Sequence, residues 1–216
     1  MKTPFLLMAL VAAMFTKAQT FDPAAIKMYW KDSAGVPFMT FDRLLKLNNH
    51  IVFITGTGKS LVPYGLYIEN GKQLHPIRKQ LNYKVSNKIH PDGVFYTTGT
   101  QAVIHPLGEK RFYKNAKWAI QSGPMLLIDG RINPALPNKK KTLRHGVGIK
   151  KDGRVYFAVI EAGMKDFAKH FLDKDCTNAL YLDGENADTW ENGNSLKKFS
   201  RFGPMIVAEK TNGNMP

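Results

Sequence analysis

Two-residue turn signals between short apolar segments constrain this fold more than any other feature of the chain. Asn70-Gly71, Asp129-Gly130 and Asp152-Gly153 each follow such a segment. Asn-Gly and Asp-Gly favour tight hairpins, because both residues tolerate positive φ. A hairpin joins antiparallel neighbours, so we expect a largely antiparallel or mixed β-sheet core. The expected strands are residues 51–55, 64–69, 94–98, 124–128, 147–150, 155–160, 179–182 and 204–208.

One segment has the periodicity of an amphipathic helix. Residues 164–172 place Phe167, Ala168 and Phe171 on one face, while charged residues occupy the others. For residues 21–50 we expect irregular structure or a short helix. The 216 residues contain no repeat and no long linker, and the length suits one domain. The sequence therefore predicts a single α+β domain with few helices.

The N-terminus has the tripartite pattern of a secretory signal peptide. Lys2 precedes an apolar run over residues 5–15, and Ala18 is a small residue suited to cleavage. The run is too short to span a membrane, and a buried N-terminal helix is the alternative. We expect cleavage after Ala18 and a secreted or periplasmic protein. The expected organisation is a signal peptide at 1–18, an N-terminal segment packing on the domain at 19–50, the domain at 51–209 and a flexible tail at 210–216.

Charge and cysteine content limit the classes of partner and cofactor. The chain has 31 Lys and Arg against 17 Asp and Glu, a net charge of +14 that favours anionic ligands. Because no nucleic-acid module accompanies this charge, we expect no specific nucleic-acid binding. Cys176 is the single cysteine, which excludes an intrachain disulfide, and we expect it to be buried. The histidines are dispersed and no metal-binding motif occurs, so we expect neither a metal nor a cofactor. The oligomeric state is left open.

Residues 57–60, Thr-Gly-Lys-Ser, are similar to the end of a phosphate-binding P-loop. However, Phe53 occupies the position of the first required glycine, and Pro63 interrupts the helix that must follow. A glycine-rich turn is the better prediction. Gly58 is a candidate substrate-binding residue, because backbone amides in such a turn can contact an anion.

Five segments form sequence motifs that overall composition does not explain: residues 65–71, 92–96, 119–127, 144–148 and 176–184. In order and spacing they resemble the phosphodiester glycosidase family, which includes the catalytic domain of the enzyme that uncovers mannose 6-phosphate on lysosomal proteins. The resemblance extends from about Phe53 to Ala208. It implies a single α+β domain that hydrolyses a sugar 1-phosphodiester, outside the cytoplasm in this case.

The chain departs from the usual pattern of that family at three places. Gly56 stands where similar proteins carry an asparagine, and His145 stands where they usually carry another. Residues 185–188, Glu-Asn-Ala-Asp, replace small and hydroxylated residues. These departures favour an alternative function, a catalytically silent member of the fold that binds anionic glycan or another polyanion.

Three candidate catalytic residues follow from the resemblance. Asp183 ends a buried apolar strand just before a glycine, and would supply the carboxylate near the developing oxocarbenium ion. A turn-forming aspartate is the alternative. Arg144 would clamp the phosphate through its planar guanidinium, unless it is merely a solvated basic residue. Gln121 would donate from its amide to a phosphate or a sugar hydroxyl.

The candidate substrate-binding residues flank these three. They are Ser122, Gly123, His145, Gly184 and Glu185, together with Gly58. Turn formation explains the Ser-Gly-Pro sequence nearly as well as ligand binding does. His145 is either an acid or anion partner or a packed histidine, and Glu185 is either a second carboxylate, a cation ligand or a solvated residue. The expected ligand is a sugar phosphate or an anionic glycan.

Overall fold

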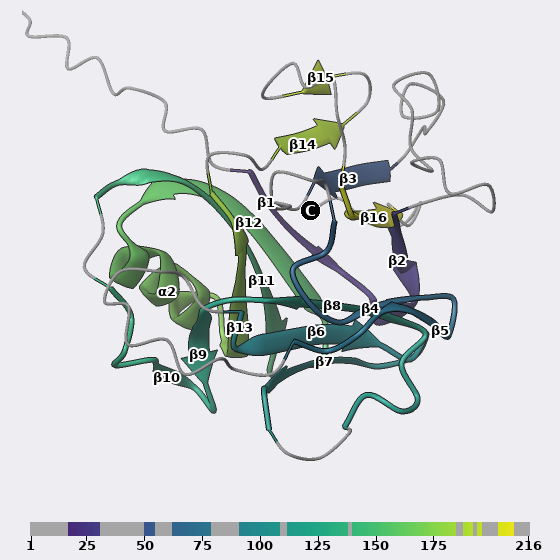
Figure 1. Cartoon of the computed structure of the whole chain (residues 1–216). Coiled ribbons are helices and arrows are strands. Elements are labelled where there is room, and N and C mark those ends of the chain that lie inside the picture. The colour runs from purple at the N-terminus through teal and green to yellow at the C-terminus, as the bar shows by residue number, and fades with distance from the viewer. Residues whose placement is uncertain are drawn as a thin grey trace, which may run out of the picture.

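The computed structural model describes residues 17–30, 50–54, 62–78, 91–108, 112–137, 140–184, 188–191, 194–195 and 203–209. Within these residues, Figure 1 shows three β-sheets and one α-helix, with the helix on the outer side of the largest sheet. Every strand pair in the described residues is antiparallel, as the turn signals predict.

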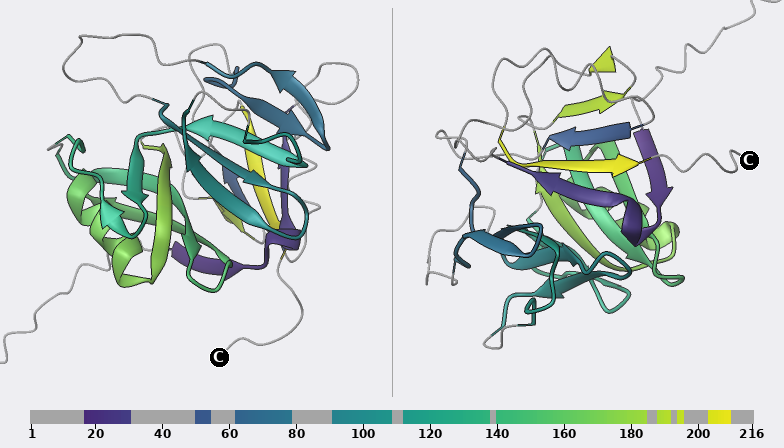
Figure 2. Two further views of the ribbon diagram at one scale, coloured as in Figure 1. Left: turned by 90° about the horizontal axis from the view of Figure 1, so that it is seen from below. Right: turned by 90° about the vertical axis from the view of Figure 1, so that its right-hand side faces the viewer.

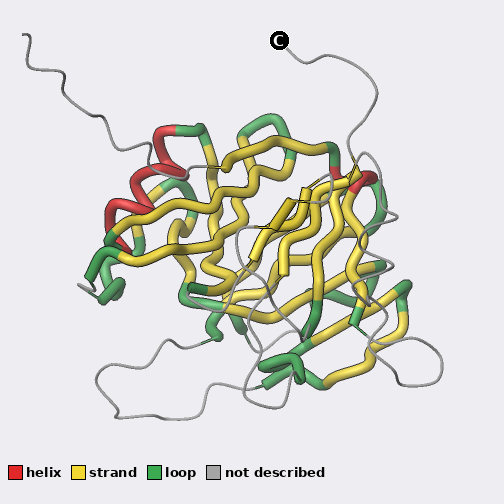
Figure 3. Tube along the Cα trace, turned by 90° about the horizontal axis from the view of Figure 1, so that it is seen from above, coloured by secondary structure: helices red, strands yellow, loops and turns green. Residues whose placement is uncertain are grey.

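The largest sheet has six strands, and helix α2 (Met164–Asp173) covers one of its faces (Figure 3). Its order is β1 (Lys17–Phe21), β12 (Val155–Ala162), β11 (Thr142–Lys150), β13 (Cys176–Asp183), β9 (Met125–Ile128) and β10 (Arg131–Ile132). Strands β11 and β12 are buried almost throughout, because both faces of the sheet are covered.

Two further sheets of five strands pack beside the first, as the two views of Figure 2 show. One has the order β15 (Asn194–Ser195), β14 (Asp188–Glu191), β3 (His50–Ile54), β16 (Met205–Glu209) and β2 (Ile26–Tyr29). The other has the order β5 (Lys72–His75), β4 (Tyr67–Glu69), β8 (Trp118–Ser122), β6 (Gly93–Thr97) and β7 (Ala102–Pro106).

Two hydrophobic clusters lie on opposite faces of the six-stranded sheet. The larger joins all three sheets, and at its centre the Phe157 ring meets Phe21 and Phe95 edge to face, with centroids 6.0 and 6.1 Å away. The other fills the space under helix α2, where Phe167 and Phe171 are fully buried. This arrangement leaves the ends of β8 and β13 close together at one rim of the core.

Several expectations from the sequence are confirmed. The α+β class, the helix and its buried face all occur as predicted. The Asn70-Gly71 and Asp129-Gly130 turns have positive φ at both residues and connect β4 to β5 and β9 to β10. Cys176 is buried, with 2% of its surface exposed.

Over residues 21–30, the expectation of irregular structure or a short helix is met at Pro23–Ala25 and is wrong at Phe21 and at Ile26–Tyr29, which are in strands. A 3₁₀ helix occurs at Pro23–Ala25, but it lies between two strands, β1 and β2, each of which joins a different sheet. Strand β2 has only four residues, and its partners in β16 lie 176 to 182 residues away, so no local pattern predicts it. Residues 31–49 lie outside the described residues.

The predicted cleavage site after Ala18 falls inside strand β1, where Ala18 pairs with Ala158. Cleavage there stays a prediction. No described helix is long and apolar enough to cross a membrane. The predicted tail at 210–216 lies outside the described residues.

Candidate functional site

A pocket of about 150 Å³ lies where β8 and β13 end. Its wall comes from both strand ends and from three segments distant in sequence. The described lining residues are Pro63, Tyr64, Pro91, Ile120, Gln121, Ser122, Gly123, Tyr181, Leu182, Asp183 and Pro204. Four of the predicted site residues therefore line one pocket: Gln121, Ser122, Gly123 and Asp183. They lie at the ends of β8 and β13, which belong to different sheets.

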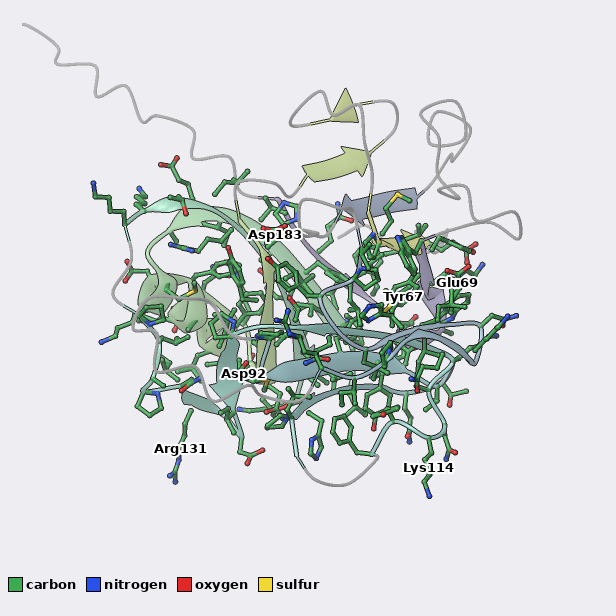
Figure 4. The ribbon with its side chains drawn as sticks, viewed as in Figure 1. Tyr67, Glu69, Asp92, Lys114, Arg131 and Asp183 are labelled. Carbon is green, nitrogen blue, oxygen red and sulfur yellow. The ribbon has the colours of Figure 1, made fainter. Side chains whose placement is uncertain are left out.

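Asp183, labelled in Figure 4, is the last residue of β13, and its half-buried side chain lines the pocket. One carboxylate oxygen, Oδ1, accepts a hydrogen bond from the backbone N–H of Gly184. A side chain at position 184 would collide with the Tyr181 hydroxyl, 2.5 Å from the place of its Cβ. Gly184 therefore lets the Tyr181 hydroxyl lie close to the backbone directly after Asp183. Among the described lining residues, Asp183 is the one that carries a carboxylate.

The turn from β8 to β9 forms the wall opposite Asp183, and hydrogen bonds hold it from both sides. The Ser122 hydroxyl donates to the Leu182 carbonyl (3.0 Å), and Tyr181 N–H donates to the Pro124 carbonyl (3.1 Å). On the other side, the Asp92 carboxylate accepts from Met125 N–H (2.6 Å). The Gly123-Pro124 peptide bond between these contacts is cis. Figure 4 labels Asp92 and Asp183.

Gln121 lines the pocket, and both the oxygen and the nitrogen of its side-chain amide form hydrogen bonds with backbone groups. Its Oε1 accepts from the N–H groups of Leu66 (2.8 Å) and Arg78 (2.9 Å), and its Nε2 donates to the carbonyls of Arg78 (2.8 Å) and Pro91 (2.9 Å). These four bonds use both amide hydrogens. The amide therefore ties together the segments that carry Tyr64 and Pro91.

Arg144 and His145 lie on the neighbouring strand β11 and outside the described lining of the pocket. Successive residues of a strand point to opposite faces of a sheet. The Arg144 side chain, 2% exposed, donates to the Ala162 (2.7 Å) and Lys140 (2.8 Å) carbonyls. Its guanidinium also lies 5.9 Å from the centre of the Tyr181 ring.

His145 pairs in register with Asp183 across the β11–β13 ladder. It is 1% exposed, so it is packed into the sheet rather than presented to solvent. Gly58 and Glu185, the two remaining candidates, lie outside the described residues. Within the described residues, no three His, Cys, Asp or Glu side chains gather where they could hold a metal ion.

Sequence reasoning missed the aromatic and proline part of the wall. Tyr64 is 52% exposed and lines the pocket beside Pro63, and Pro91 and Pro204 complete this wall. Tyr181, a further lining residue, lies within residues 176–184, a segment of the family resemblance, and this position could have marked it as a site residue. The other residues stand in irregular segments, where single-sequence patterns carry little information about long-range neighbours.

Comparison with known proteins identifies the group to which this fold and pocket belong. The family described as Phosphodiester glycosidase matches residues 42–207. This chain belongs to the phosphodiester glycosidase family. The match includes all of the described lining residues of the pocket.

This phosphodiester glycosidase family member is similar in sequence to a curated protein and similar in fold to solved structures. It is 34% identical over 196 residues to the uncharacterized protein YigE of Escherichia coli strain K12, covering 83% of this chain and 76% of that protein. The zebrafish N-acetylglucosamine-1-phosphodiester alpha-N-acetylglucosaminidase catalytic domain, auto-inhibited by its pro-peptide, has a TM-score of 0.66 at 13% identity. That match covers 94% of this chain and 85% of the zebrafish chain.

A hypothetical protein from Synechocystis has a TM-score of 0.55, also at 13% identity, over 90% of this chain and 59% of that chain. At such identities the two solved structures establish the fold and nothing beyond it. Both support the sheet architecture described above.

Proposed function

We propose that this protein is an exported hydrolase that cleaves a sugar 1-phosphodiester, with the pocket at Asp183 as its active site. The observation that carries the proposal is the meeting of Asp183 with Ser122 and Gly123 in one pocket. The family to which the chain belongs supports the class of reaction. Export, with cleavage after Ala18, is part of the proposal, and N-terminal sequencing of the secreted protein tests it.

The chemistry suits a pocket with one carboxylate. The bond between the sugar C1 and the phosphate oxygen breaks, the oxygen leaves with the electron pair, and water supplies the hydroxyl that C1 acquires. The proton released from that water passes to the phosphate or to solvent. A phosphate is a good leaving group, because its second pKa is about 6, and it departs without a strong general acid. Asp183 stabilises the positive charge that develops on the sugar ring.

The remaining residues position this carboxylate and admit the substrate. Gly123 has no side chain, so the phosphate or sugar can approach the backbone of the β8–β9 turn closely. Ser122 and Gln121 hold the two walls in place through the bonds described above. In this proposal both act on substrate through the backbone that they fix.

Arg144, expected from the sequence to bind phosphate directly, takes a positioning role in this proposal. Two of its nitrogens donate to carbonyls, and its charge lies against Tyr181, which lines the pocket. Arg144→Lys separates the two roles. Lysine retains the charge but loses the planar fork that reaches both carbonyls, so a positioning role predicts lower protein stability together with lower turnover.

The test is release of reducing sugar from a panel of α-linked sugar 1-phosphodiesters. We expect turnover by the wild-type protein and at least about a hundredfold loss in Asp183→Asn. Asp166→Asn, an exposed aspartate on helix α2, is the matched control and should keep wild-type turnover. Binding of the phosphodiester without release by a folded wild-type protein would contradict the proposal, and would favour the silent glycan-binding alternative.

A further inference from the structure

Tyr64 is an aromatic residue that lines the pocket and is largely exposed. Its 52% exposed surface is the largest among the exposed large hydrophobic residues of the described chain, ahead of Leu172 and Leu74. An exposed tyrosine gains free energy when a ligand covers its ring, because apolar surface then leaves water. Its position at the pocket makes such a ligand the natural partner.

The backbone that carries Tyr64 is fixed although the ring is exposed. The Gly65 carbonyl lies 2.8 Å from the His75 Nδ1, and Leu66 N–H donates to the Gln121 Oε1. The space beside Gly65 is also closed, since a Cβ there would collide with the Gln121 side chain. The backbone beside Tyr64 is therefore held in place before a ligand arrives, which lowers the entropic cost of ordering this segment on binding.

The pocket around Tyr64 is lined by both apolar and polar residues. Prolines 63, 91 and 204 line the wall, whereas Ser122 and Asp183 stand at the two strand ends. A pyranose has the same division, with C–H bonds on its faces and hydroxyl groups around its edge. Hydroxyl groups can donate to the Asp183 carboxylate, whereas a sugar carboxylate would meet it with like charge.

We propose that Tyr64 is a specificity-determining residue whose ring stacks on the apolar face of a pyranose, and that the Asp183 carboxylate in the same pocket favours a neutral pyranose over an acidic one. The inference deepens the proposed function and rests on it for the identity of the whole substrate. Binding of the sugar alone, however, can be measured whether or not the protein hydrolyses a phosphodiester.

Titration of the full-length mature protein with methyl N-acetyl-α-D-glucosaminide, followed by NMR, tests the stacking. We expect Tyr64→Phe to keep the dissociation constant within about twofold, because the ring is retained. Tyr64→Ala should raise it by about tenfold. Leu172→Ala, which removes an exposed apolar side chain on helix α2, is the matched control and should bind like the wild-type protein. Methyl α-D-glucuronide should bind more weakly than the neutral glycoside.

Three outcomes overturn the inference: equal binding by Tyr64→Ala and wild type, tighter binding of the glucuronide, or no binding of either glycoside by the wild type. The thermal midpoint of Tyr64→Ala shows that any loss is not due to unfolding. Turnover separates this inference from the proposed function. Hydrolysis together with sugar binding that is equal in Tyr64→Ala and wild type removes the stacking role of Tyr64 and keeps the enzyme, whereas Tyr64-dependent sugar binding without hydrolysis removes the enzyme and keeps the stacking role.

Discussion

The Ser122 hydroxyl donates to the Leu182 carbonyl, 3.0 Å away, and so ties the end of β8 to the residue before Asp183. The two residues belong to different sheets and are 60 positions apart in the chain. This bond connects the turn at Gly123 with the carboxylate across the pocket. Its removal is therefore expected to affect the site more than the fold.

Ser122→Ala should lower the free energy of unfolding by about 1 kcal/mol, the usual contribution of one hydrogen bond. Turnover should fall further, by about tenfold, because the position of Asp183 becomes less defined. Urea unfolding and release of reducing sugar measure the two effects. Thr177→Ala is the control, since Thr177 donates to the Ile149 carbonyl (3.3 Å) at the other end of β13. Equal losses of turnover in the two variants would show that the bond has no special role at the site.

Gln121→Glu should destabilise the protein by about 3 kcal/mol at neutral pH. The variant keeps an oxygen for the Leu66 and Arg78 N–H groups, but it sets a second oxygen against the Arg78 and Pro91 carbonyls. Protonation of the new carboxyl restores a donor, so the difference from the wild-type protein should shrink as the pH falls. Urea unfolding at several pH values measures this. A difference in the free energy of unfolding between Gln121→Glu and wild type that does not change with pH would contradict the hydrogen bonds assigned to the Gln121 amide.

Gln121 also shows how far the sequence could predict this site. The Gln-Ser-Gly-Pro segment and Asp183, both singled out from the sequence, contribute to the lining of one pocket, and their role in function stays a prediction. The use of the Gln121 amide was not predictable, because its partners lie 30 to 55 residues away in segments without regular patterns. The sheets were predictable where local turn chemistry dictates pairing, as at Asn70-Gly71. Strand β2 was not, since its pairing depends on distant partners.

The glycine pattern of strand β11 has its reason in packing rather than in catalysis. A Cβ at Gly146 would lie 2.9 Å from ring atoms of both Phe167 and Phe171 on helix α2. Gly146→Ala should therefore cost about 2 kcal/mol of stability, because the rings are fully buried and have no free space. Gly108→Ala is the control, because nothing lies within 4 Å of its Cβ position. Thermal unfolding compares the two variants, and equal melting temperatures of Gly146→Ala and Gly108→Ala would contradict the predicted clash.

The Glu69 carboxylate on β4 accepts from the N–H of Trp30 (3.1 Å), the residue that follows β2 of another sheet, and from the hydroxyl of Tyr67 (3.4 Å) on its own strand. Burial is the largest influence on the pKa of Glu69 and raises it from 4.5. The folded protein then holds this proton more tightly than the unfolded chain does. Its contribution to stability is complete below the unfolded pKa and is lost as the pH rises through the folded pKa. The melting temperature of the wild-type protein minus that of Glu69→Gln should therefore decrease as the pH rises over that interval. Glu161→Gln, on an exposed position of β12, is the control, and a difference that grows with pH would contradict the raised pKa.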